Sequence, residues 1–137
     1  MKVIMIALCF YFMISCVNHN NYLIIPNKGV GRYIISKQVN KKNVLPDELH
    51  LQYERGVYLR SIVIYSDKYY TKEGIRVGMN LDELVKKCGQ PTLIKKIDVT
   101  SGEYIISPLG EVYIYNGIAY LYNEHRIIIA IYIFKEI

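Results

Sequence analysis

Four apolar side chains between residues 80 and 91 share one helix face at positions i, i+3, i+4 and i+7: Leu81, Leu84, Val85 and Cys88. Asn80 is a favourable N-cap, and Glu83 three residues later completes the pattern of a capping box. Gly89 can take the left-handed conformation that ends a helix, and Pro91 prevents its continuation. The pattern predicts one short helix in which Cys88 is a small buried side chain.

The segments after this helix are short, apolar and aromatic, and turn residues separate them, which is typical of strands. They span residues 92–98, 103–106, 111–115, 118–122 and 126–134. Asn116-Gly117 joins two of them and is the dipeptide favoured in a two-residue type I′ turn. The sequence therefore predicts an α+β fold in which an antiparallel β-meander packs on the one short helix.

Loop lengths predict the register of this meander. They pair Tyr104 with Tyr113, Tyr113 with Tyr120 and Tyr120 with Ile128, and paired residues share a face. One face is then aliphatic and forms the bed for the helix, with Val112, Ile114, Ala119, Leu121, Ile127, Ile129, Ile131 and Ile133. The other face, called here the tyrosine face, carries Tyr104, Tyr113, Tyr115, Tyr120, Tyr122, Tyr132 and Phe134. A one-residue shift in the last loop would move residues 127–133 to the other face.

An additional N-terminal hairpin is predicted at residues 49–54 and 57–65, around Arg55-Gly56. It matches the C-terminal hairpin at one constant offset: Tyr53, Ile62, Ile64 and Tyr65 correspond to Tyr122, Ile131, Ile133 and Phe134. The match suggests a duplicated unit whose copies form one continuous sheet or two facing sheets. Residues 22–36 are expected to contain strand and residues 37–46 a loop. We divide the mature chain into an N-terminal β-rich half, 22–70, and a unit at 71–137 that holds the helix and four or five strands.

The N-terminus has the pattern of a secretory signal at residues 1–15. Lys2 precedes an apolar run at residues 3–14, which is shorter than the about 20 residues needed to span a bilayer. Met13-Ile14-Ser15-Cys16 resembles a lipobox, with Met13 in place of the usual Leu, so Cys16 is the predicted site of lipidation and residues 16–21 form the lipidated tether. The alternative is an ordinary cleaved signal with Cys16 as a bystander. We expect an exported protein anchored in the cell envelope, at the outer membrane or the outer face of the inner membrane.

Composition argues against several classes of function, among them nucleic-acid binding and catalysis. The chain has 137 residues, 14 of them tyrosine, and a net charge of +5. Its basic residues are scattered as isolated pairs such as Lys86-Lys87, so we expect no nucleic-acid partner. Removal of the signal and lipidation of Cys16 would leave Cys88 as the remaining cysteine, which excludes an internal disulfide. No metal, cofactor or catalytic motif is recognised, so we predict that the protein is not an enzyme.

Residues 74–91, GIRVGMNLDELVKKCGQP, resemble the signature of the SmpA/OmlA (BamE-like) outer-membrane lipoproteins. The β-lactamase inhibitor proteins share the same type of fold, and the resemblance covers roughly residues 74–134. It implies a small α+β unit that binds other proteins through its sheet. The chain departs from the assembly lipoproteins by having no Trp and by having extra strands before the motif.

These features favour a lipid-anchored protein-binding or envelope-assembly module with a protein partner in the envelope. The partner-binding residues would be Tyr104, Tyr113, Tyr115, Tyr120, Tyr122 and Tyr132, because tyrosine is enriched in interfaces. Strands of the first half could instead cover this face and make the tyrosines core residues with their hydroxyls at the rim. A further alternative is a soluble secreted or periplasmic protein that binds carbohydrate or another small ligand on the tyrosine face.

Overall fold

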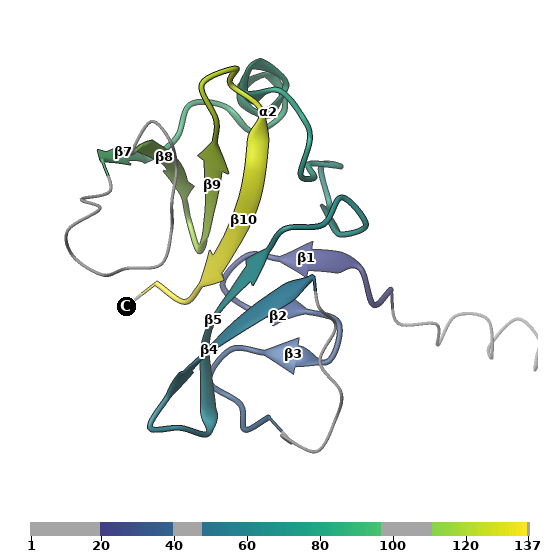
Figure 1. The fold of residues 1–137 in the computed structure, drawn as a ribbon, viewed down its shortest axis with the longest axis vertical. Helices are drawn as coiled ribbons and strands as arrows, with labels where there is room; N and C mark the ends of the chain where they lie inside the picture. The colour runs from purple at the N-terminus through teal and green to yellow at the C-terminus, as the bar shows by residue number, and fades with distance from the viewer. Residues whose placement is uncertain (1–19, 40–47, 97–110, 137) are drawn as a thin grey trace, which may run out of the picture.

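The computed structural model describes residues 20–39, 48–96 and 111–136, and within them the fold is α+β as predicted (Figure 1). A six-stranded sheet has the order β4 (Leu49–Glu54), β5 (Tyr58–Ile64), β10 (Ile128–Phe134), β9 (Ile118–Tyr122), β8 (Glu111–Tyr115) and β7 (Leu93–Lys96). A smaller sheet has the order β3 (Tyr33–Ile34), β2 (Gly29–Val30), β1 (Leu23–Ile25) and β6 (Tyr70–Thr71). Every pair of the larger sheet is antiparallel, whereas β1 and β6 run parallel.

The helix α2 (Leu81–Cys88) forms where the sequence predicts it. The Asn80 side chain accepts a hydrogen bond from the Asp82 backbone nitrogen at 2.7 Å, which satisfies one of the free donors of the first turn. Gly89 ends the helix with a φ of 79°, and its nitrogen donates to the Val85 carbonyl at 2.8 Å. Acidic residues in the first turn and lysines in the last favour the helix dipole at both ends.

The predicted register is correct between β8 and β9 but not on either side of this pair. Tyr113 pairs with Tyr120 across a two-residue turn in which Gly117 has a φ of 72°. Asn116 is not among the residues with positive φ, so the turn is not the predicted type I′. On its other side β8 pairs with β7, and this places Ile94 rather than Tyr104 opposite Tyr113. Tyr104 and the strand predicted at residues 103–106 lie outside the described residues.

Between β9 and β10 the predicted pairing of Tyr120 with Ile128 is wrong. Tyr120 pairs with Ile131, and a β-bulge interrupts the register between Ile128 and Ala130. The extra residue of the bulge moves Ile131 and Ile133 onto the tyrosine face, and Tyr132 and Phe134 onto the opposite face. Ile131 and Ile133 thereby become fully buried.

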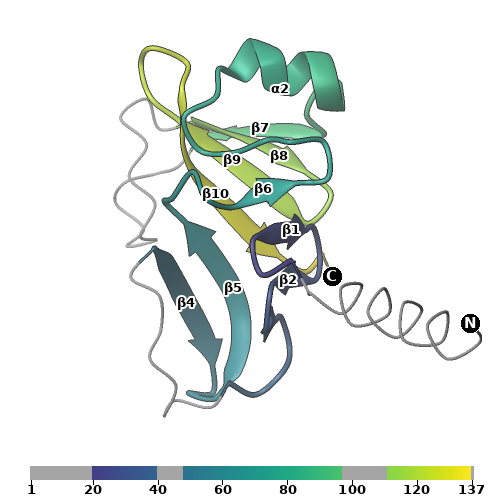
Figure 2. The same ribbon diagram turned by 90° about the vertical axis from the view of Figure 1, so that its right-hand side faces the viewer.

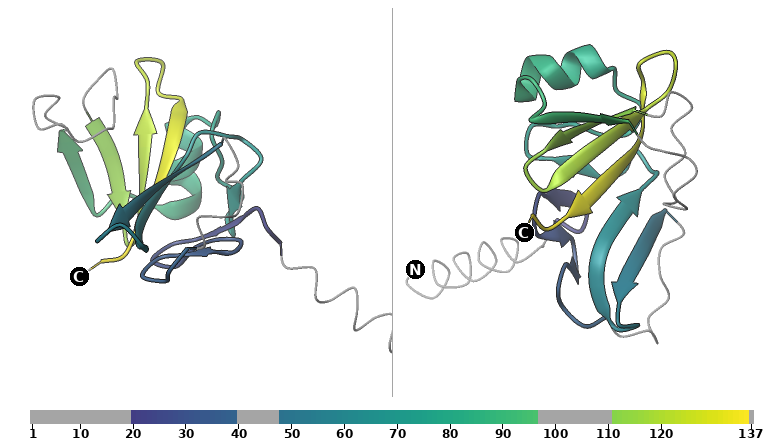
Figure 3. Two further views of the ribbon diagram at one scale, coloured as in Figure 1. Left: turned by 60° about the horizontal axis from the view of Figure 1, so that its bottom comes forward. Right: turned by 90° about the vertical axis from the view of Figure 1, so that its left-hand side faces the viewer.

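The six-stranded sheet has its larger core on the tyrosine face. Leu81 and Leu84 of α2 and Ile24 and Val30 of the small sheet belong to the same cluster as Tyr120. Figures 2 and 3 show α2 and the small sheet on one side of the large sheet. The prediction that α2 packs on the aliphatic face is therefore wrong. That opposite face carries a smaller buried cluster of Val63, Val112, Leu121 and Ala130.

The two hairpins of the large sheet have the same register. Leu51 pairs with Ile62 as Tyr120 pairs with Ile131, at the offset of the sequence match. Each hairpin then carries a β-bulge at the same place, after Gln52 in the first and next to Leu121 in the second. The hairpins join through β5 and β10, where Ile64 lies opposite Ile131 and Ile62 opposite Ile133. They therefore form one continuous sheet with a local two-fold relation about the sheet normal.

The segments that lead into the two hairpins also correspond. The Ser36 nitrogen donates to the Leu59 carbonyl at 2.7 Å, as the Gly78 nitrogen donates to the Ile128 carbonyl at 2.8 Å. Ser36 and Gly78 both have positive φ, of 69° and 94°. Between the second lead-in and its hairpin the chain inserts α2, β7 and β8. The two lead-ins thus make the same backbone contact with their hairpins, while α2, β7 and β8 lie between the second lead-in and its hairpin.

Candidate functional sites

The tyrosine face is largely core. Tyr120 and Tyr122, two of the residues predicted to bind a partner, are 2% and 4% exposed, so neither side chain is accessible at the surface. The Tyr120 ring packs edge to face on that of the half-buried Tyr115, with ring centroids 5.7 Å apart. The Tyr122 ring packs in the same way on that of the half-buried Tyr113, at 5.3 Å. Tyr132 lies half-buried on the opposite face against the smaller cluster, and Tyr104 lies outside the described residues. Tyr120 and Tyr122 are therefore core residues, as in the alternative in which other parts of the chain cover the tyrosine face.

The hydroxyls of two of these tyrosines make structural hydrogen bonds. Tyr115 Oη donates to the Gly89 carbonyl at the end of α2 at 2.9 Å, and Tyr122 Oη donates to Glu111 Oε2 at 2.8 Å. Burial raises the pKa of Tyr115 to about 12. Burial, with a contribution from Glu111, raises the pKa of Tyr122 to about 12 as well. Both phenols are therefore protonated donors near neutral pH.

Cys88 is half-buried at the end of α2 and packs against the larger cluster. Burial raises the pKa of its thiol, and the nearby Glu73 carboxylate raises it further. Since the thiolate is the reactive form, this environment does not activate Cys88 as a nucleophile. The structure supports its interpretation as a small packing residue, although it is less buried than predicted.

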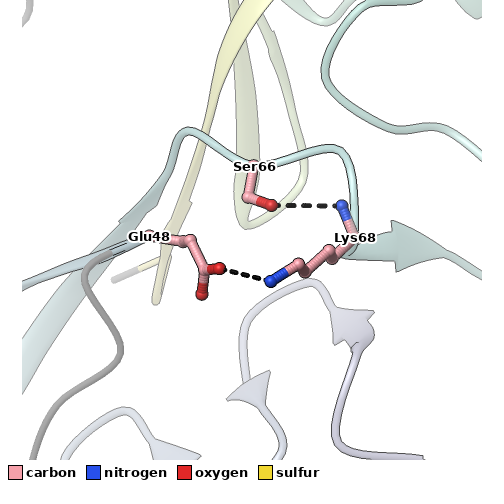
Figure 4. Close-up of polar contacts among 3 residues, drawn as sticks. All are labelled: Glu48, Ser66 and Lys68. Atoms are coloured by element: carbon pink, nitrogen blue, oxygen red, sulfur yellow. Dashed lines mark hydrogen bonds and ion pairs between the residues drawn. The ribbon is translucent and has the colours of Figure 1, made fainter.

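A surface pocket of about 210 Å³ lies where the small sheet meets the start of β4. Its lining comes from four separate segments, at residues 21–22, 31–33, 48–49 and 68–69. Lys68 Nζ forms an ion pair with Glu48 Oε1 at 2.6 Å, and the Lys68 backbone nitrogen donates to Ser66 Oγ at 3.2 Å (Figure 4). The hydrogen bond to Glu48 raises the pKa of Lys68. The pocket therefore has a partly exposed carboxylate–ammonium pair on its wall.

Aromatic rings and a second cation complete this pocket. Tyr22 is exposed and meets the buried Tyr69 edge to face, with centroids 5.4 Å apart. The Arg32 guanidinium lies over the Tyr33 ring at 6.0 Å from its centroid. Within the described residues no carboxylate forms an ion pair with Arg32. Sequence reasoning missed this pocket because its residues come from four short segments that are distant in the sequence and share no local motif.

The edge strand β7 carries two exposed aliphatic side chains. Leu93 is 54% exposed and Ile94 is 51% exposed, although both lie within a strand. Leu93 pairs with Ile114 and Ile94 with Tyr113, so the two side chains lie on opposite faces of the sheet. Among the described residues β7 has β8 as its single neighbour. The strand thus presents an unpaired backbone edge flanked by apolar side chains on both faces.

Comparisons with protein-family models, with curated proteins and with solved structures found no match for this chain. Within the described residues, no three His, Cys, Asp or Glu side chains gather in a group that could hold a metal ion. In the same part of the chain, no helix has the length and apolar character needed to cross a bilayer.

Proposed function

We propose that the mature chain is an exported, lipid-anchored and non-catalytic module that binds a protein partner in the cell envelope. The observation that supports this role best is the edge of β7, where two half-exposed aliphatic side chains lie beside backbone groups that no other described strand pairs with. Soluble proteins commonly protect such edges, because an exposed strand edge pairs readily with another chain. An extended segment of a partner could pair with β7 and cover Leu93 and Ile94 on its two faces.

The opposite edge of the same sheet is built differently. On β4 the apolar side chains Leu49 and Leu51 are buried on the core face, and His50 and Glu54 are exposed. A strand added to β4 would therefore cover little apolar side-chain surface. This contrast favours β7 over β4 as the edge at which the proposed partner would pair.

The proposed anchor is a lipid on Cys16, which precedes the first described strand by a short tether. This arrangement of lipid, tether and small domain agrees with the resemblance of residues 74–91 to the SmpA/OmlA lipoproteins. The alternative of a soluble protein that binds carbohydrate on the tyrosine face loses support, because Tyr120 and Tyr122 are buried. We therefore propose the anchored protein-binding module alone.

Site-specific photo-crosslinking in intact bacteria tests the β7 interface. A photoreactive residue at position 93 should yield one discrete crosslinked partner, and the second substitution Ile94→Lys should abolish it. Position 57 is the matched control, because Val57 is 41% exposed but lies in the turn between β4 and β5. Absence of a product from position 93, or the same products from both positions, would contradict the proposal.

A further inference from the structure

We infer that the pocket between the small sheet and β4 is a binding site for a phosphate group. Two cations border it, Arg32 from the β2–β3 turn and Lys68 from the segment before β6. Glu48 engages one ammonium donor of Lys68, whereas Arg32 stacks on Tyr33 and has no carboxylate partner in the described residues. The lining thus holds one more positive than negative charge. Guanidinium groups bind phosphate oxygens in a bidentate manner, and the Lys68 ammonium supplies a second point charge.

The second copy of the hairpin shows that the fold does not require this pocket. The Glu48 carbonyl accepts the Tyr65 nitrogen at 3.2 Å, as the Gly117 carbonyl accepts the Phe134 nitrogen at 3.2 Å. Gly117 is therefore the counterpart of Glu48. At Gly117 the position is filled by Asn27, whose nitrogen donates to the Gly117 carbonyl and whose Oδ1 accepts from the Glu136 nitrogen. Glu48 instead lines the pocket, together with Arg32 and Lys68.

The position of the pocket suggests the source of the phosphate. Asn21 lines the pocket and is five residues from Cys16 in the sequence, a distance of at most about 18 Å in an extended chain. If the proposed lipid anchor holds, the pocket lies near the membrane surface, where basic side chains attract anionic headgroups and tyrosine is enriched. A lipid headgroup as the source rests on that proposed function, whereas phosphate binding itself rests on Arg32 and Lys68.

The test uses an unlipidated chain that starts at residue 16 and carries Cys16→Ser. Every residue of the two core clusters lies after residue 23, so this chain keeps the whole core. NMR titrations would follow the Arg32 side-chain N–H and the Gly31 amide. The probes are glycerol 3-phosphate, with glycerol as the uncharged counterpart, and inorganic phosphate. Vesicles of phosphatidylglycerol, with phosphatidylcholine vesicles as the control, distinguish a lipid headgroup from a free phosphate compound.

We expect saturable shifts with millimolar glycerol 3-phosphate and none with glycerol. Arg32→Gln should weaken binding about tenfold or more, because it removes hydrogen bonds between charged groups. Arg60→Gln makes the same charge change on β5, outside the pocket, and should have no effect. Glu48→Gln should tighten binding, because it releases Lys68 to the ligand.

Each outcome decides the inference. Binding to phosphatidylglycerol vesicles that depends on Arg32 would identify the headgroup as the source, and Arg32-dependent binding of soluble phosphates alone would identify a free phosphate compound. Two results would overturn the phosphate site. One is that the Arg32 side-chain N–H signal does not shift with millimolar glycerol 3-phosphate. The other is that Arg32→Gln and Arg60→Gln weaken binding equally. Since neither lipidation nor β7 enters these measurements, their failure would leave the proposed function unaffected.

Discussion

The two hairpins of the large sheet share their register and their bulge but differ in what surrounds them. The first, β4–β5, carries the pocket at Glu48. The second, β9–β10, is separated from its lead-in by α2, β7 and β8, and its counterpart of Glu48 is closed by Asn27. The two hairpins thus have the same backbone hydrogen-bond pattern. The candidate sites lie where the two copies differ.

The difference extends to matched side-chain pairs. The pair Gln52 and Ser61 in the first hairpin corresponds to Leu121 and Ala130 in the second. Ser61 Oγ donates to Gln52 Oε1 at 2.6 Å, whereas Leu121 and Ala130 belong to the smaller apolar cluster. The same position is thus satisfied by a hydrogen bond in one copy and by apolar packing in the other. The two hairpins therefore share their strand register but differ in the polarity of the paired side chains.

The largest expected effect is the loss of matched core side chains. Tyr120→Ala should lower the free energy of unfolding by about 3–5 kcal/mol, and its counterpart Leu51→Ala by about 2–5 kcal/mol, because both leave cavities in the larger core. Denaturant unfolding measures both. Ile94→Ala should change stability by less than about 0.5 kcal/mol, since this side chain is half exposed. A small effect at Tyr120 would contradict its place in the core.

The next largest expected effect is a difference in stability loss between alanine substitutions at two glycines of similar φ. Gly56 and Gly117 have φ values of 74° and 72°, so alanine at either position should cost about 1–2 kcal/mol in backbone strain. A Cβ at Gly56 meets open space, whereas at Gly117 it overlaps Asn27. Gly117→Ala should therefore cost about 1–3 kcal/mol more, as overpacking does. Equal losses in thermal unfolding would contradict the contact between Asn27 and the β8–β9 turn.

A smaller effect distinguishes the two lead-ins. Gln38 forms an isolated bridge to Tyr58, the first residue of β5, and Asn80 forms one to Ile127, which directly precedes β10. Asn80→Ala should cost about 1 kcal/mol because Asn80 also caps α2. Gln38→Ala should change the free energy of unfolding by less than about 0.5 kcal/mol, because Gln38 is exposed and caps no helix of the described residues. Denaturant unfolding measures both variants. Equal losses in the free energy of unfolding would contradict the capping role of Asn80.

The smallest expected effect at neutral pH concerns a tyrosine hydroxyl of the second copy. Tyr122→Phe removes the bond to Glu111 and should cost about 0.5–1.5 kcal/mol. The pKa of Tyr122 is raised in the folded state to about 12, so its contribution is complete below pH about 10, the unfolded pKa, and is lost as the pH rises through about 12. The stability of Tyr122→Phe should therefore fall less steeply over this range. Equally steep curves in alkaline unfolding would contradict the raised pKa.

Local signals in the sequence predict much of the secondary structure but not the packing. Asn80, Gly89 and Pro91 determine the ends of α2, and Asn116-Gly117 determines the β8–β9 pairing. The face that Ile131 and Ile133 occupy depends on the bulge next to Ile128, which loop length does not reveal. The pocket could not be predicted because Arg32, Glu48 and Lys68 come together only when the small sheet meets β4. Exposure of β7 likewise depends on its position at the sheet edge, although Leu93 and Ile94 are apolar.

Metabolic labelling with palmitate tests the anchored module most directly. Full-length protein, Cys16→Ser and the control Cys88→Ser would be produced in bacteria, labelled, and separated into membrane and soluble fractions. The account predicts label and membrane association for the full-length protein and for Cys88→Ser, and loss of label for Cys16→Ser. Unlabelled full-length protein free in the periplasm or the medium, or label that persists in Cys16→Ser, would contradict it.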